Sequence, residues 1–235
     1  MKRDQDLPHM GVGHRAFTRP AANRTAPIEP RPAGRYIAAM TAETSAPAPV
    51  RPEAAARPPA GSPADAPTIL VVPHPALKAK ARRVGPADAD AVRALVPRMF
   101  AAMYAAPGIG LAAPQVGVGL RLAVVDLMPD DKPAPMVLIN PQVVGASEDT
   151  ATREEGCLSL PGQYADVTRP ARVRVRYQDE TGATRQVEAE GLLAACLQHE
   201  IDHLDGVLFV DHLSALKRNM ILRRLAKEMK QKAAG

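Results

Sequence analysis

Residues 192–204 read LLAACLQHEIDHL and lie between two glycines, Gly191 and Gly206. Nearly all of these residues are good helix formers, and Gly206 is well suited to end a helix. The apolar side chains are not confined to one side, which is typical of a helix that the rest of the protein covers. We therefore expect a central, buried helix in this part of the chain.

The segments around this helix have the patterns of short strands and of two further helices. Strands are expected at residues 69–72, 120–127, 137–144 and 171–177. The last of these alternates apolar and charged residues, as half-buried antiparallel strands do, and Thr181-Gly182 then predicts a hairpin turn into residues 184–189. Helices are expected at residues 88–103, where Pro97 should kink or interrupt the helix, and at residues 214–230. Antiparallel strands packed around one buried helix, with a C-terminal helix, indicate the α+β class.

Residues 1–66 differ in composition from the rest of the chain. They hold most of the proline–alanine runs and show no sustained apolar periodicity. Such a segment cannot bury enough apolar surface to offset its ordering entropy, so it is predicted to be a disordered, low-complexity leader before one folded domain at residues 67–235. A dispensable tail is the simplest interpretation. The Arg-rich start also fits an organellar transit peptide, or a start codon assigned too early, with Met40 or a later residue as the true beginning.

Charge and apolar content limit the possible partners and compartments. The formal net charge is +5, but the leader alone holds nine Lys and Arg against six Asp and Glu. That surplus of three leaves about two for the rest of the chain, so charge alone does not identify a partner. The chain has no run of eighteen apolar residues and no apolar stretch after Met1 that resembles a secretory signal. We therefore expect no membrane span and a cytoplasmic location.

The helix at residues 192–204 carries the pattern H-E-x-x-H, from His199 to His203. Two histidines four residues apart project from one face of a helix, so both imidazoles can bind one metal ion. Glu200 lies beside that face and is free to move protons, while the ion lowers the pKa of a bound water to near neutrality. The pattern predicts a metal-dependent hydrolase. The alternative is a buried helix whose histidines only satisfy local hydrogen bonds.

A third protein ligand is needed, and the candidates are the two cysteines, which in a chain without secretory features do not indicate a disulfide framework. Cys196 precedes His203 by seven residues, or about 10 Å along a helix, a distance that one ion cannot comfortably bridge. Cys157 lies in residues 154–161, interpreted as a turn between strands that can bring a thiolate to the helix. We therefore predict Cys157 as the ligand and Cys196 as a packing residue near the site.

Residues 107–117 form a glycine-rich segment that partly matches a dinucleotide-binding fingerprint. That interpretation fails on context, because a helix precedes the glycines and Pro114 interrupts the helix that should follow. The alternative is a ligand-binding segment. Gly108 and Gly110 have no side chains, so the main chain of a ligand can approach the backbone there, and Gln115 supplies an amide donor. A tight turn in the core would also explain the glycines.

Three segments together, residues 108–115, 155–160 and 198–206, resemble the signature motifs of the peptide deformylase family, in the family's order. Residues 69–77 and 208–214 are also similar to that family, so the resemblance covers about residues 67–232 and makes the domain at 67–235 deformylase-like. The resemblance implies a metal-dependent hydrolase. Its members remove the formyl group from the N-terminal formyl-methionine of newly synthesised polypeptides and release formate.

The resemblance also implies roles for single residues. The metal ion would be bound by Cys157, His199 and His203. Glu200 would be the general base and acid, and the oxyanion would be held by the Gln115 side-chain amide and the Leu158 backbone N–H. Gly110 would be the point where the nascent peptide adds as a short strand. The methionine pocket would be lined by Ile109, Leu192, Ala195 and Cys196.

Three further implications concern the ion, the peptide and the ribosome. The family's usual ion is Fe2+, although Zn2+, Ni2+ or Co2+ can occupy such a site and the spacing does not choose among them. Tyr164 departs from the pattern of bacterial relatives, which often have Arg at this position. The departure implies that contacts to the outer part of the peptide differ from those in such relatives. Some members dock on the ribosome through a basic C-terminal helix. Ribosomal RNA binding by residues 214–230 is therefore one hypothesis, and a solvated basic face is the other.

Three other functions compete with this interpretation. An ordinary zinc protease would share the pattern from His199 to His203 but would place a third His or Glu downstream of it. A zinc-stabilised interaction domain would use four protein ligands and leave no position for water. An inactive relative would be expected to lack a residue that the chemistry needs, and all of them are present.

Overall fold

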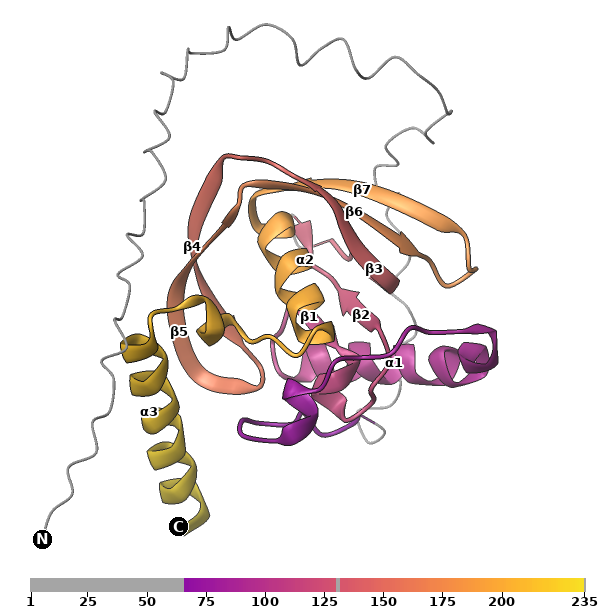
Figure 1. Cartoon of the computed structure of the whole chain (residues 1–235). Helices are drawn as coiled ribbons and strands as arrows, with labels where there is room; N and C mark the ends of the chain where they lie inside the picture. Colours follow the sequence, from indigo (N-terminus) through magenta and orange to yellow (C-terminus); the bar gives the residue numbers. More distant parts are fainter. Residues whose placement is uncertain (1–65, 130–131, 235) are drawn as a thin grey trace, which may run out of the picture. The chain divides into compact units, whose positions relative to one another are not determined.

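The computed structural model describes residues 66–129 and 132–234, which form an α+β fold (Figure 1). The strands are β1 (Gly110–Ala112), β2 (Leu122–Val125), β3 (Met136–Ala146), β4 (Thr150–Cys157), β5 (Leu160–Pro170), β6 (Arg172–Gln178) and β7 (Thr184–Glu190). The α-helices are α1 (Ala89–Ala105), α2 (Gly191–Leu204) and α3 (Ala215–Ala234). The short 3-10 helices are η2 (Pro75–Lys78), η3 (Pro86–Asp88), η4 (Ala113–Val116) and η6 (Phe209–His212). No helix within these residues is long and apolar enough to cross a membrane.

The strands form two antiparallel sheets. Five strands pair in the order β1-β2-β3-β6-β7, and β4 and β5 pair separately as a two-stranded hairpin. The hairpin turn predicted at Thr181-Gly182 connects β6 to β7, and Gly182 there has φ +83°, a conformation that favours glycine. The predicted α+β class with antiparallel strands and a C-terminal helix is confirmed.

The first strands of the larger sheet are buried on both faces. Ala123 of β2 packs in the apolar cluster that contains Leu197 of α2, whereas its neighbour Leu122 packs in the cluster that contains Met99 of α1. Because successive side chains of a strand point to opposite faces, α1 and α2 cover opposite faces of this part of the sheet. This burial explains why residues 122–125 are all apolar.

The helix α2 lies between the larger sheet and the β4–β5 hairpin (Figure 1). Its buried apolar residues pack against the sheet, while Asp202 accepts a hydrogen bond from Arg169 of β5 at 2.7 Å. The helix ends before Gly206, which has φ +74°, as the sequence predicted. The segment that carries the H-E-x-x-H pattern therefore has elements packed on two sides.

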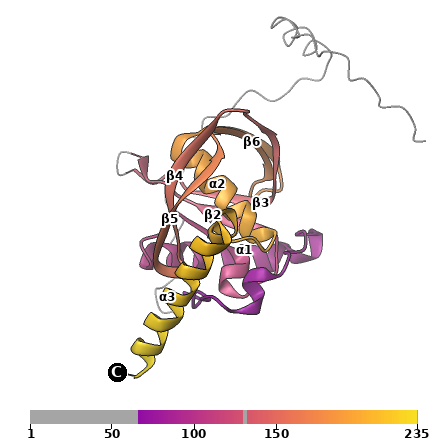
Figure 2. The same cartoon turned by 60° about the vertical axis from the view of Figure 1, so that its left-hand side comes forward.

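The C-terminal helix α3 rests against β5 and η6 and extends away from the strands in both views (Figures 1 and 2). It runs from Ala215 to Ala234, slightly longer than expected, and Ser214 accepts a hydrogen bond from Lys217 N–H at its start. Leu225 is buried in an apolar cluster that includes Leu160 and Val167 of β5. Glu228 accepts a hydrogen bond from Gln163 of β5 at 2.9 Å. These two contacts fix the second half of the helix to the domain.

One expectation about local structure is wrong and another is only partly right. Residues 69–72 form no strand, because Leu70 N–H donates to Gln115 O and Val72 N–H donates to Ser159 O, which belong to different segments. Residues 154–161 do contain the expected turn between strands, but it is confined to Leu158 and Ser159, since β4 ends at Cys157 and β5 begins at Leu160. The hairpin escaped prediction because its exposed positions are polar and its apolar residues do not alternate regularly.

Two further expectations concern a proline and the leader. The helix α1 continues through Pro97 without interruption. The leader expected at residues 1–66 lies outside the described residues except for Ala66, so it stays a prediction.

Candidate active site

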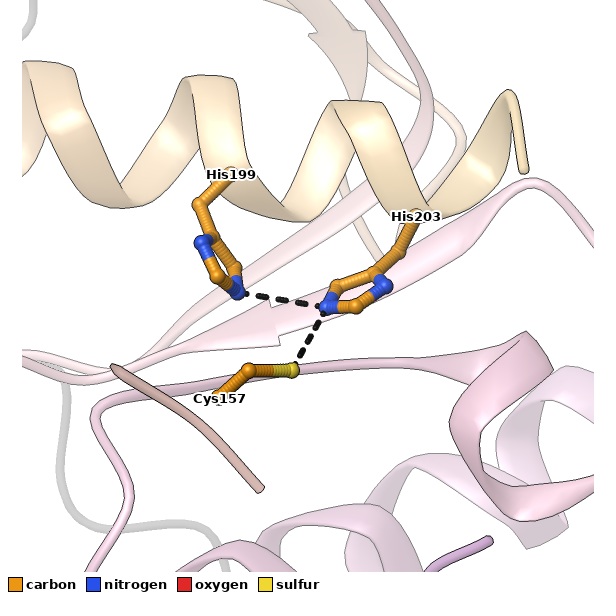
Figure 3. Close-up of side chains that lie close together, drawn as sticks. All are labelled: Cys157, His199 and His203. Atoms are coloured by element: carbon orange, nitrogen blue, oxygen red, sulfur yellow. Dashed lines mark hydrogen bonds between the residues drawn. The ribbon is translucent and has the colours of Figure 1, made fainter. Parts of the chain in front are cut away.

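Three side chains that can each hold a metal ion converge beside α2 (Figure 3). His199 and His203 stand one turn apart on the same face of the helix, and Cys157 approaches them from the end of β4. His203 Nε2 lies 3.2 Å from Cys157 Sγ and 3.2 Å from His199 Nε2, and the three ligand atoms all lie within 4.8 Å of one another. The structure therefore brings together the three residues that the sequence predicted as ligands.

The donor atoms of this cluster suit a transition-metal ion. One sulfur and two imidazole nitrogens are typical ligands of zinc and iron, whereas magnesium and calcium prefer oxygen. Burial, together with the neighbouring His199, holds the pKa of His203 well below its usual value, so this imidazole is neutral and keeps a lone pair for a ligand. Three protein ligands would leave positions for water and substrate, as in catalytic metal sites.

Glu155 orients one of the two histidines. Its Oε2 lies 3.0 Å from His199 Nδ1, and Arg169 donates to both of its oxygens at 2.6 and 3.0 Å. Burial alone would raise the pKa of Glu155, but the hydrogen bonds from His199 and Arg169 outweigh burial and lower the pKa to about 2. An ionised carboxylate can only accept, so His199 donates from Nδ1 and presents Nε2 to the cluster.

Sequence reasoning missed Glu155 and Arg169 as parts of the site. A signal for Glu155 did exist, because it stands two residues before Cys157 and such residues point to the same side of a strand. Recognition of β4 as a strand would have found it. Arg169, by contrast, is identified only by its contacts in the structure. Besides Glu155 it donates to Asp202, and the same Asp202 carboxylate lies 2.7 Å from His212 Nε2.

Glu200 lies beside the cluster and is almost completely buried. Burial is the main reason why its pKa is raised to about 7; the charge of His199 opposes the rise and that of Glu155 adds to it. A divalent cation beside the carboxylate would lower this pKa. Glu200 Oε2 has no hydrogen-bond partner among the described residues, and a Cβ added to Gly110 would lie 2.3 Å from Oε1. Only a glycine at position 110 leaves room for this carboxylate.

Gln115 is held so that its amide nitrogen faces the cluster. Its Oε1 accepts a hydrogen bond from Ala112 N–H at 2.8 Å, and its Nε2 donates to Ser159 Oγ at 3.2 Å and to Cys157 Sγ at 3.6 Å. Leu158 directly follows Cys157 in the turn between β4 and β5. The two residues predicted to hold an oxyanion thus both lie beside Cys157.

A cavity of about 550 Å³ opens onto this cluster. Its lining includes every predicted site residue except His203, which is buried behind the others. Cys196 lies in the wall with its sulfur 3.8 Å from Ile109 O, and burial raises the pKa of its thiol well above the usual value, so it is a neutral packing group. Several lining residues that the sequence did not assign to the site come from the hairpin, among them Arg153 and Gln163, and Tyr164 of the hairpin lines the cavity as well.

A buried glutamate beside a Cys/His/His cluster, at the inner end of a cavity in an α+β fold, is the arrangement of a metal-dependent hydrolase. The family model described as "Polypeptide deformylase" matches residues 66–219. The chain belongs to this family.

Individual relatives agree with the family match. A peptide deformylase of Mesorhizobium japonicum is 51% identical over 168 residues, which cover 71% of this chain and 95% of the relative. A peptide deformylase of Phenylobacterium zucineum is 52% identical over 163 residues, 69% of this chain and 96% of the relative.

Solved structures show the same similarity. The crystal structure of a peptide deformylase from Legionella pneumophila matches with a TM-score of 0.67 and 45% identity, over 72% of this chain and 99% of that chain. That of a peptide deformylase from Synechococcus elongatus in complex with actinonin matches with a TM-score of 0.62 and 45% identity, over 67% of this chain and 86% of that chain.

Proposed function

We propose that Cys157, His199 and His203 hold one divalent metal ion, and that Glu200 on the central helix α2 moves the protons, in the reaction that this chain catalyses. That reaction is the removal of the N-terminal formyl group from newly synthesised polypeptides. The observation that carries the proposal is the convergence of three metal-binding atoms next to a buried carboxylate at the inner end of one cavity. One oxygen of this carboxylate, Glu200 Oε2, has no hydrogen-bond partner among the described residues.

Glu200 is placed to work as base and then as acid. When bound, the ion would lower the pKa of a water molecule and polarise the formyl carbonyl. Glu200 accepts the proton that the water loses as its oxygen bonds to the formyl carbon. The carboxylate then returns that proton to the amine nitrogen as the C–N bond breaks, which yields formate and a free N-terminus. Glu200 Oε2 has no hydrogen-bond partner among the described residues, so this oxygen is available to take up the proton and to give it back.

Gln115 and Leu158 stabilise the negative charge that develops on the formyl oxygen. Gln115 is pre-oriented by the Ala112 hydrogen bond, so its amide needs no reorganisation during the reaction. The methionine side chain packs among Ile109, Leu192, Ala195 and Cys196, which form an apolar wall of the cavity. The backbone at Gly110 pairs with the peptide as a short strand.

Fe2+ is the proposed native ion, with Zn2+, Ni2+ and Co2+ as alternatives that the same ligands accept. Protein purified without oxygen should contain about one equivalent of iron, measured by elemental analysis, since the site has a single set of ligands. A stoichiometric content of zinc with full activity would contradict the choice of iron and leave the ligand assignment intact.

A formate-release assay with formyl-Met-Ala-Ser tests the activity directly. The metal-loaded protein should release formate, and a chelator should abolish release. Because a related deformylase has been solved with actinonin, the same compound should occupy this cavity, inhibit release and raise the melting temperature. No formate release from the loaded protein would overturn the proposed function.

The basic helix α3 is the proposed contact to the ribosome, in the cytoplasm. Its cationic residues are mostly exposed, and they are Lys217, Arg218, Arg223, Arg224, Lys227, Lys230 and Lys232. A helix that presents positive charge along its length suits the phosphates of RNA. Such contact would hold the enzyme near emerging polypeptides.

A further inference from the structure

A fully buried carboxyl residue is one hydrogen bond away from a wall of the cavity. Asp126 directly follows β2, is 0% exposed and does not itself line the cavity. Its backbone N–H donates to Ile109 O at 2.9 Å, next to the pair of Val125 and Gly110 that joins β2 to β1. Ile109 does line the cavity and belongs to the wall proposed for methionine. The position of Asp126 therefore bears on that wall.

The side chain of Asp126 connects α1 to the residues that follow β2. Tyr104 of α1 donates to Asp126 Oδ2 at 2.6 Å, and the backbone N–H groups of Met128 and Ala134 each donate to Oδ1 at 3.0 Å. The Tyr104 ring stacks on Phe100, which is fully buried, and this packing holds the hydroxyl in place. Both oxygens of the carboxylate are thus held, and the backbone of the same residue is held with them.

The placement of Ile109 depends on backbone contacts of this kind. Its neighbours Gly108 and Gly110 have no side chains to anchor the segment, and Ile109 itself is 39% exposed, so packing covers it only in part. The Ile109 carbonyl accepts from Asp126 N–H at 2.9 Å and from Cys196 Sγ at 3.8 Å. The first of these is a backbone hydrogen bond of ordinary length, so a shift of Asp126 is passed on to this part of the wall.

We propose that Asp126 is a positioning residue for the recognition of methionine. Tyr104 holds its carboxylate, and its backbone N–H holds Ile109 where the side chain of the formyl-methionine packs. This inference rests on the proposed deformylase function. A purely structural role, in which Asp126 only ties down the backbone of Met128 and Ala134, would affect stability but not the preference for methionine.

The test compares two peptides that differ only in the first side chain. Formate release from formyl-Met-Ala-Ser and formyl-Ala-Ala-Ser is measured for the metal-loaded wild type, Tyr104→Phe, Asp126→Asn and Gln178→Met. The wild type should prefer the methionine peptide. In Tyr104→Phe the ratio of the two kcat/KM values should fall by roughly three- to tenfold, at or below the smallest effect of one lost methylene group in an apolar pocket. The fall should come from a higher KM for the methionine peptide, because neither Tyr104 nor Asp126 lines the cavity.

Two further variants make this comparison specific. Asp126→Asn keeps an oxygen for the two backbone donors, and its amide can donate to the Tyr104 hydroxyl, so it should keep most of the preference. Gln178→Met is the matched control, because it removes one hydrogen-bond partner of the buried Asn140 at 3.0 Å, as Tyr104→Phe removes one of Asp126. Neither Gln178 nor Asn140 lines the cavity, so the preference should stay unchanged in this control.

Four outcomes would overturn the inference. They are an unchanged preference in Tyr104→Phe, an equal loss of kcat/KM on both peptides, a loss of preference in Gln178→Met as large as in Tyr104→Phe, and no preference in the wild type. Tyr104→Phe removes a single oxygen and keeps the stacked ring, so it should fold, and a thermal melt checks this. Failure of the proposed function is distinguishable, since the wild type would then release no formate from either peptide.

Discussion

Two glutamates that lie near His199 show how environment separates the roles of identical side chains. Glu155 has its pKa lowered to about 2, because hydrogen bonds from His199 and Arg169 outweigh the effect of burial. Glu200 is buried without such partners, and its pKa is raised to about 7. One carboxylate is therefore an anion that orients His199, a proposed metal ligand, whereas the pKa of the other stays raised as long as no cation lies beside it.

Glu200→Ala should separate proton transfer from metal binding. Glu200 is not one of the three residues whose ligand atoms gather in the cluster, so the variant should keep a near-stoichiometric ion and a folded domain. Formate release should fall by roughly a hundredfold or more, the usual contribution of general acid–base catalysis. Elemental analysis and the formate assay on the same preparation check this, and undiminished release would remove Glu200 from its assigned role.

The two cysteines should respond differently to mutation. Cys157→Ala removes one of the three proposed ligands and should lower metal content and melting temperature together, because ion binding contributes to the stability of the folded state. Cys196→Ala is the matched control, since its sulfur lies in the cavity wall and is a neutral thiol. Full metal content in Cys157→Ala with metal loss in Cys196→Ala would show that the ligands are assigned wrongly.

Glu155→Gln should weaken metal binding without removing a ligand. The amide cannot hold His199 Nδ1 as the ionised carboxylate does, and loss of such a partner typically costs about ten- to a hundredfold in metal affinity. Competition with a chelator of known affinity measures the change. An unchanged dissociation constant would mean that Glu155 serves only to pair with Arg169.

At the scale of the elements, α3 has an anchored side and a basic side. Leu225 is buried and Glu228 accepts from Gln163, a buried residue that also lines the cavity. Cutting the chain after Leu225 would therefore remove the Glu228 contact together with the positive charges. A test of ribosome binding needs variants that change the charge and leave this anchor in place.

Charge reversal of Lys227 and Lys230 is such a variant. Both side chains are exposed, so Lys227→Glu with Lys230→Glu should leave folding and formate release from small peptides unchanged. Co-sedimentation with ribosomes should weaken and become less dependent on salt, because fewer phosphate contacts are made. Arg93→Glu with Lys132→Glu, at exposed positions elsewhere, is the control. Equal co-sedimentation of both double variants would count against the role of α3.

At the scale of the whole molecule, the described residues show that the folded domain includes the segment from Ala66 onward. Ala66 and Ile69 pack against the cluster around α1, and Leu70 and Val72 each donate a backbone hydrogen bond, to Gln115 and Ser159 respectively. These four residues therefore belong to the domain. The segment before them is the part whose composition predicts no contribution to the core.

Two truncations that differ by seven residues should have different effects on stability. Deletion of residues 1–65 should leave the melting temperature and formate release essentially unchanged. Deletion of residues 1–72 removes the two backbone hydrogen bonds and leaves the carbonyl groups of Gln115 and Ser159 without these donors, which should destabilise the domain by a few kcal/mol. Activity should also fall, because Leu70 no longer holds the backbone of Gln115 in place. A drop of several degrees after the shorter deletion would show that the leader packs on the domain.

The sequence by itself determined the features that depend on a few neighbouring residues. The spacing of His199 and His203 predicts one metal-binding face, because the geometry of a helix sets their separation whatever surrounds it. The clean alternation at residues 171–177 and the turn at Thr181-Gly182 likewise predict β6 and β7, and the structure confirms them.

Tertiary structure decided everything that depends on partners distant in the chain. Residues 69–72 have the composition of a strand, but the segments beside them offer single hydrogen bonds and no ladder. The hairpin of β4 and β5 lacks a regular apolar pattern, yet it supplies Cys157, Glu155 and Arg169 to the site. Arg169 can be buried because its guanidinium pairs with the carboxylates of Glu155 and Asp202, which lie 14 and 33 residues away in the sequence. No pattern of neighbouring residues predicts such contacts.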